Sequence, residues 1–398
     1  MKFKKIYSVV VLFPLVVLIC LWSLRYSLVP WLWVDLAIAV WLLIAGRIAE
    51  KQLSKIILFN LAAVPFAFFL AELYYYVTTG QEQIVSTGTY ATKSFFKKDD
   101  QLGYRPIPSI TCNLKRLRGK ETVCDVTYTI NADGLRDTPS SNNNSDKCLL
   151  FFGCSFAFGE CLNDQETLPY FMGNELPGKY KILNFGFQGY GPHQMLAALE
   201  TGIVDNVIKG CQQVDVVYSA IPHHVARAAG YSPWDKHGPK YVLEKQTLVH
   251  KGAFDGSQVT TSVLNRVKAH MLRSPVLKKL LPRKKIVTSD LEKDTFIAIL
   301  ERAQALIKRK YSDARFMVFF WDANYLSNDS DKKDSEIIIK KLAEKGFEYY
   351  QAQDALEDYN KDPQRRYTVG KYDGHPSAEA NKLIAAFLKK KLETQQQK

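Results

Sequence analysis

Residues 148–159 read CLLFFGCSFAFG, an apolar run that ends at Gly153 and is followed by Ser155. A short apolar run bounded by turn residues is typical of a buried strand. Gly153 permits a tight turn after that strand, and the residues beyond Ser155 suit the start of a helix. The stretch therefore predicts a strand that turns sharply into a helix, with Ser155 on the turn.

The same alternation continues toward the C-terminus. Further short apolar runs are separated by amphipathic stretches of helix length, such as 290–310 and 335–345. This rhythm predicts an α/β fold with a parallel sheet covered on both faces, over residues 148–395. The five predicted strands are 148–152, 181–185, 214–220, 315–321 and 347–350.

Residues 230–289 interrupt this alternation with a hairpin-like piece and a basic amphipathic stretch. We expect them to form an insertion over the C-terminal edge of the sheet, where α/β proteins bind ligands.

The N-terminal 78 residues are strongly apolar. Residues 6–24, 28–46 and 56–77 are each about as long as a bilayer requires, which predicts three transmembrane helices. A cleaved signal peptide is the alternative for the first stretch, but no small-residue cleavage site follows it.

The basic residues around these stretches predict an orientation. They favour a cytoplasmic N-terminus and an extracytoplasmic C-terminal domain on a bacterial cytoplasmic (inner) membrane. The net charge of +13 comes from scattered basic residues, and no zinc-ligand or RNA-binding motif accompanies them. It favours contact with anionic lipid head groups over nucleic acid. The residues that set the orientation are Lys2, Lys4, Lys5, Arg25, Arg47, Lys51 and Lys55.

Residues 79–147 predict a polar stalk to about residue 98, followed by a small β-rich lead-in of short strands and turns.

The seven cysteines show no CxxC pair and are too dispersed for a metal site. Cys112 and Cys124 flank a predicted hairpin and could pair in an oxidising compartment.

Ser155 is a candidate nucleophile because backbone N–H groups at the following helix N-terminus suit a developing oxyanion. The alternative is that Ser155 caps that helix. A serine hydroxyl needs a base, and the base needs a carboxylate to fix its tautomer. Residues 372–379 read YDGHPSAE and supply His375 and Asp373 just before the last predicted helix, 378–392.

Three blocks of the chain resemble the SGNH (GDSL-like) hydrolase superfamily, in its membrane-anchored bacterial type. FFGCSFAFG resembles the first block, ILNFGFQGYG the second and DGHPSAEANKLIA the last. The resemblance covers residues 148–395 and implies a flavodoxin-like three-layer α/β/α domain with ester-cleaving chemistry and no cofactor. It also implies that the backbone N–H groups of Ser155 and Gly189 form the oxyanion hole.

The chain departs from this family pattern at several positions. Cys154 replaces the usual Asp and is expected to point into the core. Asp373 precedes His375 by two residues, where three is the commonest spacing and two is known in alginate-acetylation relatives. The third block, residues 221–225, lacks its oxyanion-hole Asn. His223 or His224 could donate to the oxyanion instead, or both could simply cap a strand end; a metal site is not expected there.

These observations predict a membrane-anchored serine esterase or deacylase acting on an acylated glycan or lipid outside the cytoplasmic membrane. Arg227 is the candidate for binding an anionic group of the substrate. The same triad would also serve an O-acyltransferase that modifies an exported polysaccharide, with a membrane acyl-transfer partner. A third interpretation is a non-catalytic membrane protein with a degenerate SGNH domain.

Overall fold

The computed structural model describes most of the chain and divides it into two compact units. The units are Met1–Gln83 with Thr260–Lys285, and Ile84–Val259 with Ile286–Lys398. The structure describes residues 31–79, 84–92, 95–138, 145–254, 274–280, 287–322, 327, 329–362 and 364–394.

The described part of the first unit is helical. Helix α2 (Trp31–Ile48) lies along α3 (Gln52–Thr79), and the short α11 (Pro275–Leu280) contacts α3. The carboxylate of Glu72 on α3 is buried and accepts a hydrogen bond from the Ser274 hydroxyl. This acidic side chain is therefore satisfied within the unit.

One helix in the described residues is long and apolar enough to cross a membrane, Gln52–Tyr75 within α3. It corresponds to the predicted span 56–77. The span predicted at 28–46 falls largely on α2, which starts at Trp31, the first described residue, and does not meet the same length and hydropathy criteria within the described residues. The span predicted at 6–24 lies outside the described residues, and the three-span prediction is not confirmed.

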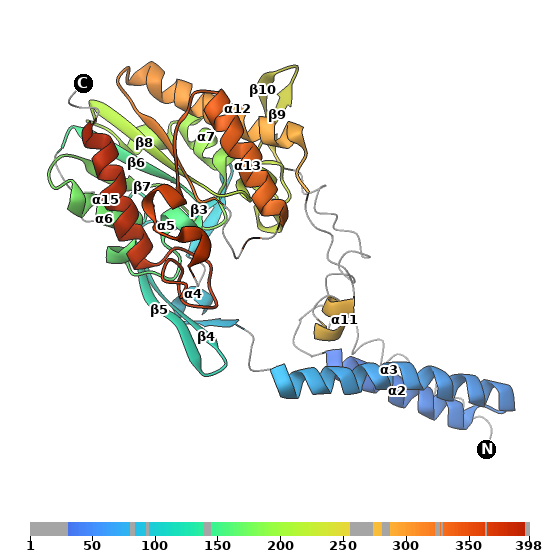
Figure 1. The fold of residues 1–398 in the computed structure, drawn as a ribbon. Coiled ribbons are helices and arrows are strands. Elements are labelled where there is room, and N and C mark those ends of the chain that lie inside the picture. Colours follow the sequence, from blue (N-terminus) through green and yellow to red (C-terminus); the bar gives the residue numbers. More distant parts are fainter. Residues whose placement is uncertain are drawn as a thin grey trace. The chain divides into compact units, whose positions relative to one another are not determined.

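A five-stranded parallel sheet forms the centre of the second unit (Figure 1). Its strand order is β12-β11-β8-β6-β7, which is the flavodoxin-like order. The direction of the crossover connections reverses between β6 and β8, which is the topological switch point of the sheet. All five strands were predicted from their apolar runs. They are β6 (Lys147–Gly153), β7 (Lys181–Asn184), β8 (Gln213–Ala220), β11 (Phe316–Phe320) and β12 (Glu348–Gln351).

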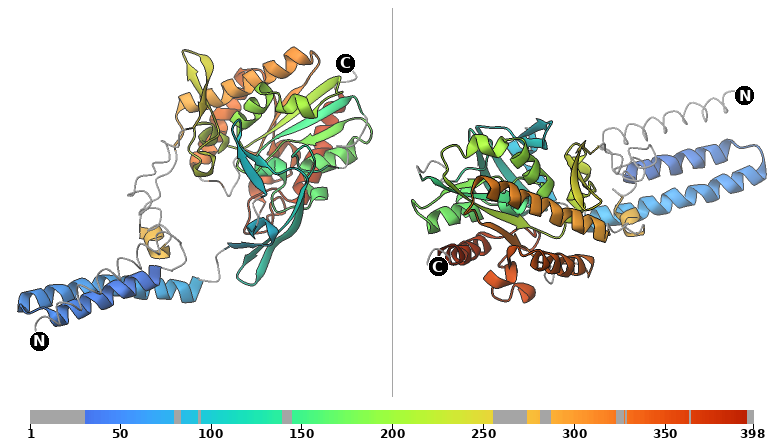
Figure 2. Two further views of the ribbon diagram at one scale, coloured as in Figure 1. Left: turned by 180° about the vertical axis from the view of Figure 1, so that it is seen from behind. Right: turned by 90° about the horizontal axis from the view of Figure 1, so that it is seen from above.

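Alternate residues of each strand face opposite sides of the sheet. Leu149 and Phe151 of β6 join one buried cluster, to which α6 (Leu168–Glu175) and α15 (Ala378–Thr394) contribute. Leu150 and Phe152 join the other cluster. That face is covered by α7 (Pro192–Glu200), α12 (Asp290–Lys310) and α13 (Asp329–Glu344), as Figure 2 shows. The predicted parallel sheet with helices on both faces is confirmed.

A β-rich region, residues 84–138, precedes this sheet. Strands β1 (Ile84–Thr87), β4 (Ile110–Arg118) and β5 (Glu121–Ile130) form an antiparallel sheet, and β2 (Phe96–Asp99) pairs with β3 (Gly103–Pro106). The segment expected to be a stalk therefore contributes β1 and β2. Backbone pairing orders it despite its polar composition: β1 pairs with the distant β4, and β2 pairs with the adjacent β3.

The remaining elements lie in connections of the second unit. The predicted insertion contains the hairpin of β9 (Pro239–Glu244) and β10 (Thr247–Ala253), while 255–273 and 281–286 are outside the described residues. The other elements are α4 (Thr89–Thr92), α5 (Ser155–Phe158), η2 (Asp164–Glu166), α8 (Ile203–Val207), α9 (His224–Ala228), η3 (Pro233–Asp235), α14 (Ala352–Ala355) and η4 (Tyr359–Lys361).

Two disulfides lie within the described residues of the second unit, and neither is the predicted pair. They link Cys124 to Cys161 and Cys148 to Cys211. Cys112 is buried and unpaired. In the β4–β5 register Cys112 lies opposite Tyr128 and Cys124 lies opposite Arg116, so the two cysteines are on different rungs. The predicted Cys112–Cys124 disulfide is therefore wrong.

The cysteine pairing can be checked by alkylation. When the protein is denatured without reductant, we expect a thiol reagent to label Cys112 and Cys154, together with Cys20, which lies outside the described residues. Mass spectrometry should find Cys124, Cys161, Cys148 and Cys211 unlabelled until a reductant is added. Labelling of Cys161 without reductant would contradict the pairing.

Candidate active site

Ser155 lies where β6 turns into α5 at the C-terminal edge of the sheet. Gly153 has a φ of +146°, and a Cβ there would come within 2.6 Å of the Ser219 carbonyl oxygen. Only glycine fits this close approach to β8, which explains the sharp turn. The first N–H groups of α5 have no intrahelical acceptor, so the Ser155 N–H is available to an oxyanion.

The structure brings Ser155, His375 and Asp373 together. His375 Nε2 lies 2.8 Å from Ser155 Oγ, and His375 Nδ1 lies 2.5 Å from Asp373 Oδ1. The backbone N–H of His375 also donates to Asp373 Oδ1, at 2.9 Å. Each ring nitrogen thus has the partner that a nucleophile–base–carboxylate set requires. Ser155 is a buried residue at the start of α5, and its hydroxyl faces the base.

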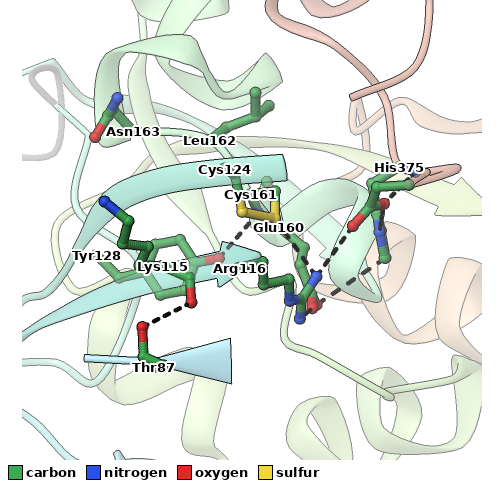
Figure 3. Close-up of a disulfide and its surroundings, with 12 residues drawn as sticks. Thr87, Lys115, Arg116, Cys124, Tyr128, Glu160, Cys161, Leu162, Asn163 and His375 are labelled. Carbon is green, nitrogen blue, oxygen red and sulfur yellow. Dashed lines mark hydrogen bonds and ion pairs between the residues drawn. A yellow bond between two sulfur atoms is a disulfide. The ribbon is translucent and has the colours of Figure 1, made fainter. Parts of the chain in front are cut away.

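Two charged residues that the sequence did not indicate complete this network, as Figure 3 shows. Arg116 on β4 donates to Asp373 Oδ2 at 3.0 Å and to Glu160 Oε1. Glu160 Oε2 lies 4.0 Å from His375 Nε2. The β-rich region therefore contributes Arg116 to the site. This residue binds Oδ2 of Asp373, the carboxylate oxygen that does not contact His375.

These charges set the protonation of the pair. Burial lowers the pKa of His375, but the hydrogen bond to Asp373 and the negative charges of Glu160 and Asp373 raise it to above its ordinary value. Burial raises the pKa of Asp373, whereas its hydrogen bonds to His375 and the Arg116 charge lower it to below its ordinary value. Asp373 stays ionised, and the site stabilises the imidazolium form of His375.

The loop that carries Glu160 is fixed from three directions. The Cys124–Cys161 disulfide joins it to β5 (Figure 3), and the Cys161 N–H donates to the Tyr128 hydroxyl at 2.9 Å. The buried Arg136 guanidinium donates to the carbonyl oxygens of Phe158, Gly159 and Leu162, at 3.1, 3.0 and 2.7 Å. The position of Glu160 relative to His375 is thus set by the β-rich region.

Gly189 lies on a loop held by two aromatic side chains. The Tyr104 hydroxyl donates to the Gln188 carbonyl at 2.7 Å, and Trp234 Nε1 donates to the Gly189 carbonyl at 3.2 Å. Gly189 has a φ of +77°, and a Cβ there would come within 2.5 Å of Trp234 Nε1. The loop requires glycine at this position. Gly189 lines a cavity of about 470 Å³ together with Glu160.

The two histidines proposed for the oxyanion hole are not brought to Ser155. His224 is fully buried, and its Nδ1 lies 2.6 Å from the Tyr218 hydroxyl. Burial and the charge of Arg227 hold the pKa of His224 well below its ordinary value. His223 is largely exposed, with Nε2 3.9 Å from Asp331 Oδ1. Within the described contacts neither touches Ser155 or Gly189. His223 is the N-cap of α9 and His224 its first residue, and β8 ends at Ala220 before them.

The other predicted side chains are also placed. Arg227 lines the same cavity as Gly189. Cys154 is buried in the core, as expected. Among the residues that the structure describes, no group of three His, Cys, Asp or Glu side chains could hold a metal ion.

Comparison with known proteins gives structural matches alone: no family model and no curated relative matches the chain. A putative G-D-S-L family lipolytic protein from Desulfitobacterium hafniense is 13% identical, with 62% of this chain and 99% of that chain covered and a TM-score of 0.35. A catalytic mutant of an acetylxylan esterase from Geobacillus stearothermophilus is 12% identical, with 63% and 95% covered and a TM-score of 0.36. A GDSL-like lipase from Bacteroides thetaiotaomicron is 15% identical, with 63% and 89% covered and a TM-score of 0.33.

The three solved structures are a lipolytic protein, a lipase and an acetylxylan esterase. At identities of 15% and below, a shared activity does not follow from the likeness. The chemistry rests on the side chains of this chain.

Glu160 and Arg116 should shift the pH dependence of the site in opposite directions. Only neutral imidazole accepts a proton, so kcat/KM for a simple acetyl ester should rise with pH through the titration of His375. Glu160→Gln removes a charge that raises the pKa of His375, and the rise should move to lower pH. Arg116→Gln removes a charge that lowers this pKa, and the rise should move to higher pH.

Glu344→Gln, at an exposed position on α13, is the matched control and should leave the pH profile unchanged. Thermal melts of all variants separate loss of fold from a shifted profile. A profile that is identical in the Glu160 and Arg116 variants would show that this charge pair does not act on His375.

Proposed function

We propose that this chain is a serine esterase in which Ser155 is the nucleophile, His375 the general base and Asp373 the residue that orients the base. The observation that carries this proposal is the His375 Nε2–Ser155 Oγ distance of 2.8 Å with Asp373 on the opposite ring nitrogen. A residue that merely capped α5 would need neither partner.

The geometry supports acyl transfer through a covalent intermediate. Ser155 Oγ attacks the acyl carbon while its proton passes to His375 Nε2. The carbonyl oxygen becomes an oxyanion, for which the Ser155 N–H and, by the family resemblance, the Gly189 N–H are the proposed donors. When the tetrahedral intermediate collapses, the ester C–O bond breaks and the leaving alcohol takes the proton from His375. Water then attacks the acyl-enzyme with His375 again as base, which releases the acid and restores Ser155.

The non-catalytic alternative is less well supported. A degenerate domain would not need to keep a buried Asp373 ionised beside His375 or to fix its second oxygen with Arg116. Such buried charges are costly unless they are paired, and here every member of the set is paired. This pairing supports the catalytic interpretation over the degenerate one.

We further propose that the enzyme is membrane-attached with its catalytic unit outside the cytoplasm. The apolar helix Gln52–Tyr75 and the basic residues flanking it support attachment. Two disulfides in the catalytic unit support an oxidising compartment. A reporter that works only outside the cytoplasm, fused after residue 398, should be active. Activity from a cytoplasm-only reporter would contradict this orientation.

The triad should act as one unit in kinetics. Ser155→Ala and His375→Ala should each abolish turnover of p-nitrophenyl acetate, and the double variant should be no worse than either, because a base without a nucleophile has nothing to activate. Asp373→Asn should lower kcat by roughly 10³–10⁴-fold, since an amide can hold the wrong tautomer.

Cys154→Ser serves as the neighbouring control and should retain most activity, because this thiol is buried in the core. Unchanged turnover in Ser155→Ala, with loss in Cys154→Ser, would assign the nucleophile to the thiol instead.

A further inference from the structure

The loop that carries Gly189 lies against the serine turn. The Phe187 N–H donates to the Gly153 carbonyl at 3.3 Å. A Cβ at Gly186 would come within 2.6 Å of the Ala157 side chain on α5, so this close packing requires glycine. In the part of the chain that the structure describes, the Gly189 N–H is hydrogen-bonded to no acceptor. This donor is therefore free to bind an oxygen atom of a ligand.

Tyr104 on β3 controls the peptide unit to which this N–H belongs. The Gln188 carbonyl and the Gly189 N–H form one planar, trans peptide unit, in which the two groups point in opposite directions. The Tyr104 hydroxyl donates to the Gln188 carbonyl at 2.7 Å. This hydrogen bond fixes the plane, and it also polarises the unit so that its N–H becomes a stronger donor. One contact thus sets both the direction and the strength of the Gly189 N–H.

Tyr104 is itself held rigidly. Its backbone carbonyl accepts a hydrogen bond from the Tyr190 hydroxyl at 2.6 Å, and its ring packs against those of Tyr190 and Phe187, with centroids 5.3 and 5.9 Å away. Burial and the negative charge of Asp235 raise the pKa of the Tyr104 hydroxyl well above its ordinary value. The hydroxyl therefore keeps its proton and remains a donor over the pH range in which His375 titrates.

The peptide unit after Gly189 is fixed from the predicted insertion. Trp234 Nε1 donates to the Gly189 carbonyl at 3.2 Å. The next residue, Asp235, is buried, and its Oδ2 accepts a hydrogen bond from Gln194 Nε2 at 2.6 Å. The other end of that amide, Gln194 Oε1, accepts from the Gly191 N–H at 2.7 Å. Side chains from two separate regions therefore hold the backbone on both sides of the Gly189 N–H, as a preorganised donor requires.

We propose that Tyr104 is a positioning residue that aims and polarises the Gly189 N–H toward the oxyanion. The inference rests on the proposed esterase function. The third sequence block lacks the oxyanion-hole Asn, and neither His223 nor His224 contacts Ser155 among the described residues. With fewer donors to share the developing charge, the orientation of the remaining backbone N–H groups has a larger effect on the rate.

Removing the Tyr104 hydroxyl should slow turnover without weakening substrate binding. Tyr104→Phe keeps the ring, and kcat for p-nitrophenyl acetate should fall by roughly 10–10²-fold, less than the ~10²–10³-fold loss that removal of an oxyanion donor causes. KM should change little, because acylation and deacylation both pass through an oxyanion and slow together. The pH at which kcat/KM rises should stay the same, since the charges that set the pKa of His375 are left in place.

Tyr180→Phe is the matched control. Tyr180 is also buried, and its hydroxyl donates to Asp215 Oδ2 at 2.9 Å. This hydrogen bond lies next to the start of β7, at the edge of the sheet opposite to Ser155. Tyr180→Phe should therefore leave kcat and KM at their wild-type values. Thermal melts of both variants report any loss of fold.

A single amide resonance reports the Gly189 N–H independently of kinetics. Gln188–Gly189 is the one Gln–Gly pair in the sequence, so ¹³C at the backbone carbonyl of glutamine and ¹⁵N at glycine select it in the full-length protein in detergent micelles. After Ser155 Oγ has displaced fluoride from diisopropyl fluorophosphate, the amide proton should move downfield, because the N–H then donates to the phosphoryl oxygen. The movement should be smaller in Tyr104→Phe and equal to that of wild type in Tyr180→Phe.

The possible results decide different claims. Wild-type kcat in Tyr104→Phe, or an amide proton that does not move once Ser155 is modified, overturns the role of Tyr104 and retains the esterase function. An equal loss of kcat in Tyr180→Phe, or a shifted pH profile in Tyr104→Phe, assigns the loss to packing and also overturns it. Failure of the wild type to cleave p-nitrophenyl acetate and to react at Ser155 rejects the esterase function, and the role of Tyr104 falls with it.

Discussion

The hydrogen bond between His375 and Ser155 joins residues 220 positions apart and requires two loops to meet at one edge of the sheet. Parallel strands bring all their C-terminal ends to that edge, so β6 can present Ser155 there. Helix α15 packs on α6 and the sheet, and this contact brings the preceding loop, with Asp373 and His375, to the same place. The strand order and helix α15 together position the two loops so that His375 and Ser155 can form this hydrogen bond.

The region before the α/β sheet belongs to the same site. Arg116 on β4 binds the second oxygen of Asp373, and the Cys124–Cys161 disulfide ties β5 to the residue after Glu160. Two opposed charges near His375, one raising and one lowering its pKa, come from this arrangement. The β-rich region thus supports the side chains of the candidate triad.

The sequence predicted the sheet because its inner strands β6, β8 and β11 are almost fully buried on both faces and appear as apolar runs. Ser155, Asp373 and His375 were also predicted, since a glycine-bounded turn and a short Asp-x-His spacing are local features. Arg116 and Glu160 were not, because their partners are distant in the chain and a charge on a strand resembles any solvated residue. Glu160 directly follows the serine turn, and this position was the one available signal.

The wrong disulfide prediction has a similar origin. Cys112 and Cys124 seemed suited to pairing because they flank a hairpin, yet the register places them on different rungs. Cys124 instead pairs with Cys161, which lies after α5, and Cys112 is a free thiol. His223 and His224 occupy the third block by alignment, but burial against Tyr218 directs one ring inward and the other faces solvent. Side-chain direction at a strand end depends on packing that a linear pattern does not contain.

Covalent labelling with a fluorophosphonate probe tests the account most directly, because such probes react with a serine only when a base has activated it. The purified protein should gain one phosphonyl group, mapped by peptide mass spectrometry to Ser155, and Ser155→Ala should gain none. His375→Ala should react far more slowly while keeping its fold. Labelling at another residue, or equal labelling in wild type and His375→Ala, would contradict the claim that His375 activates Ser155.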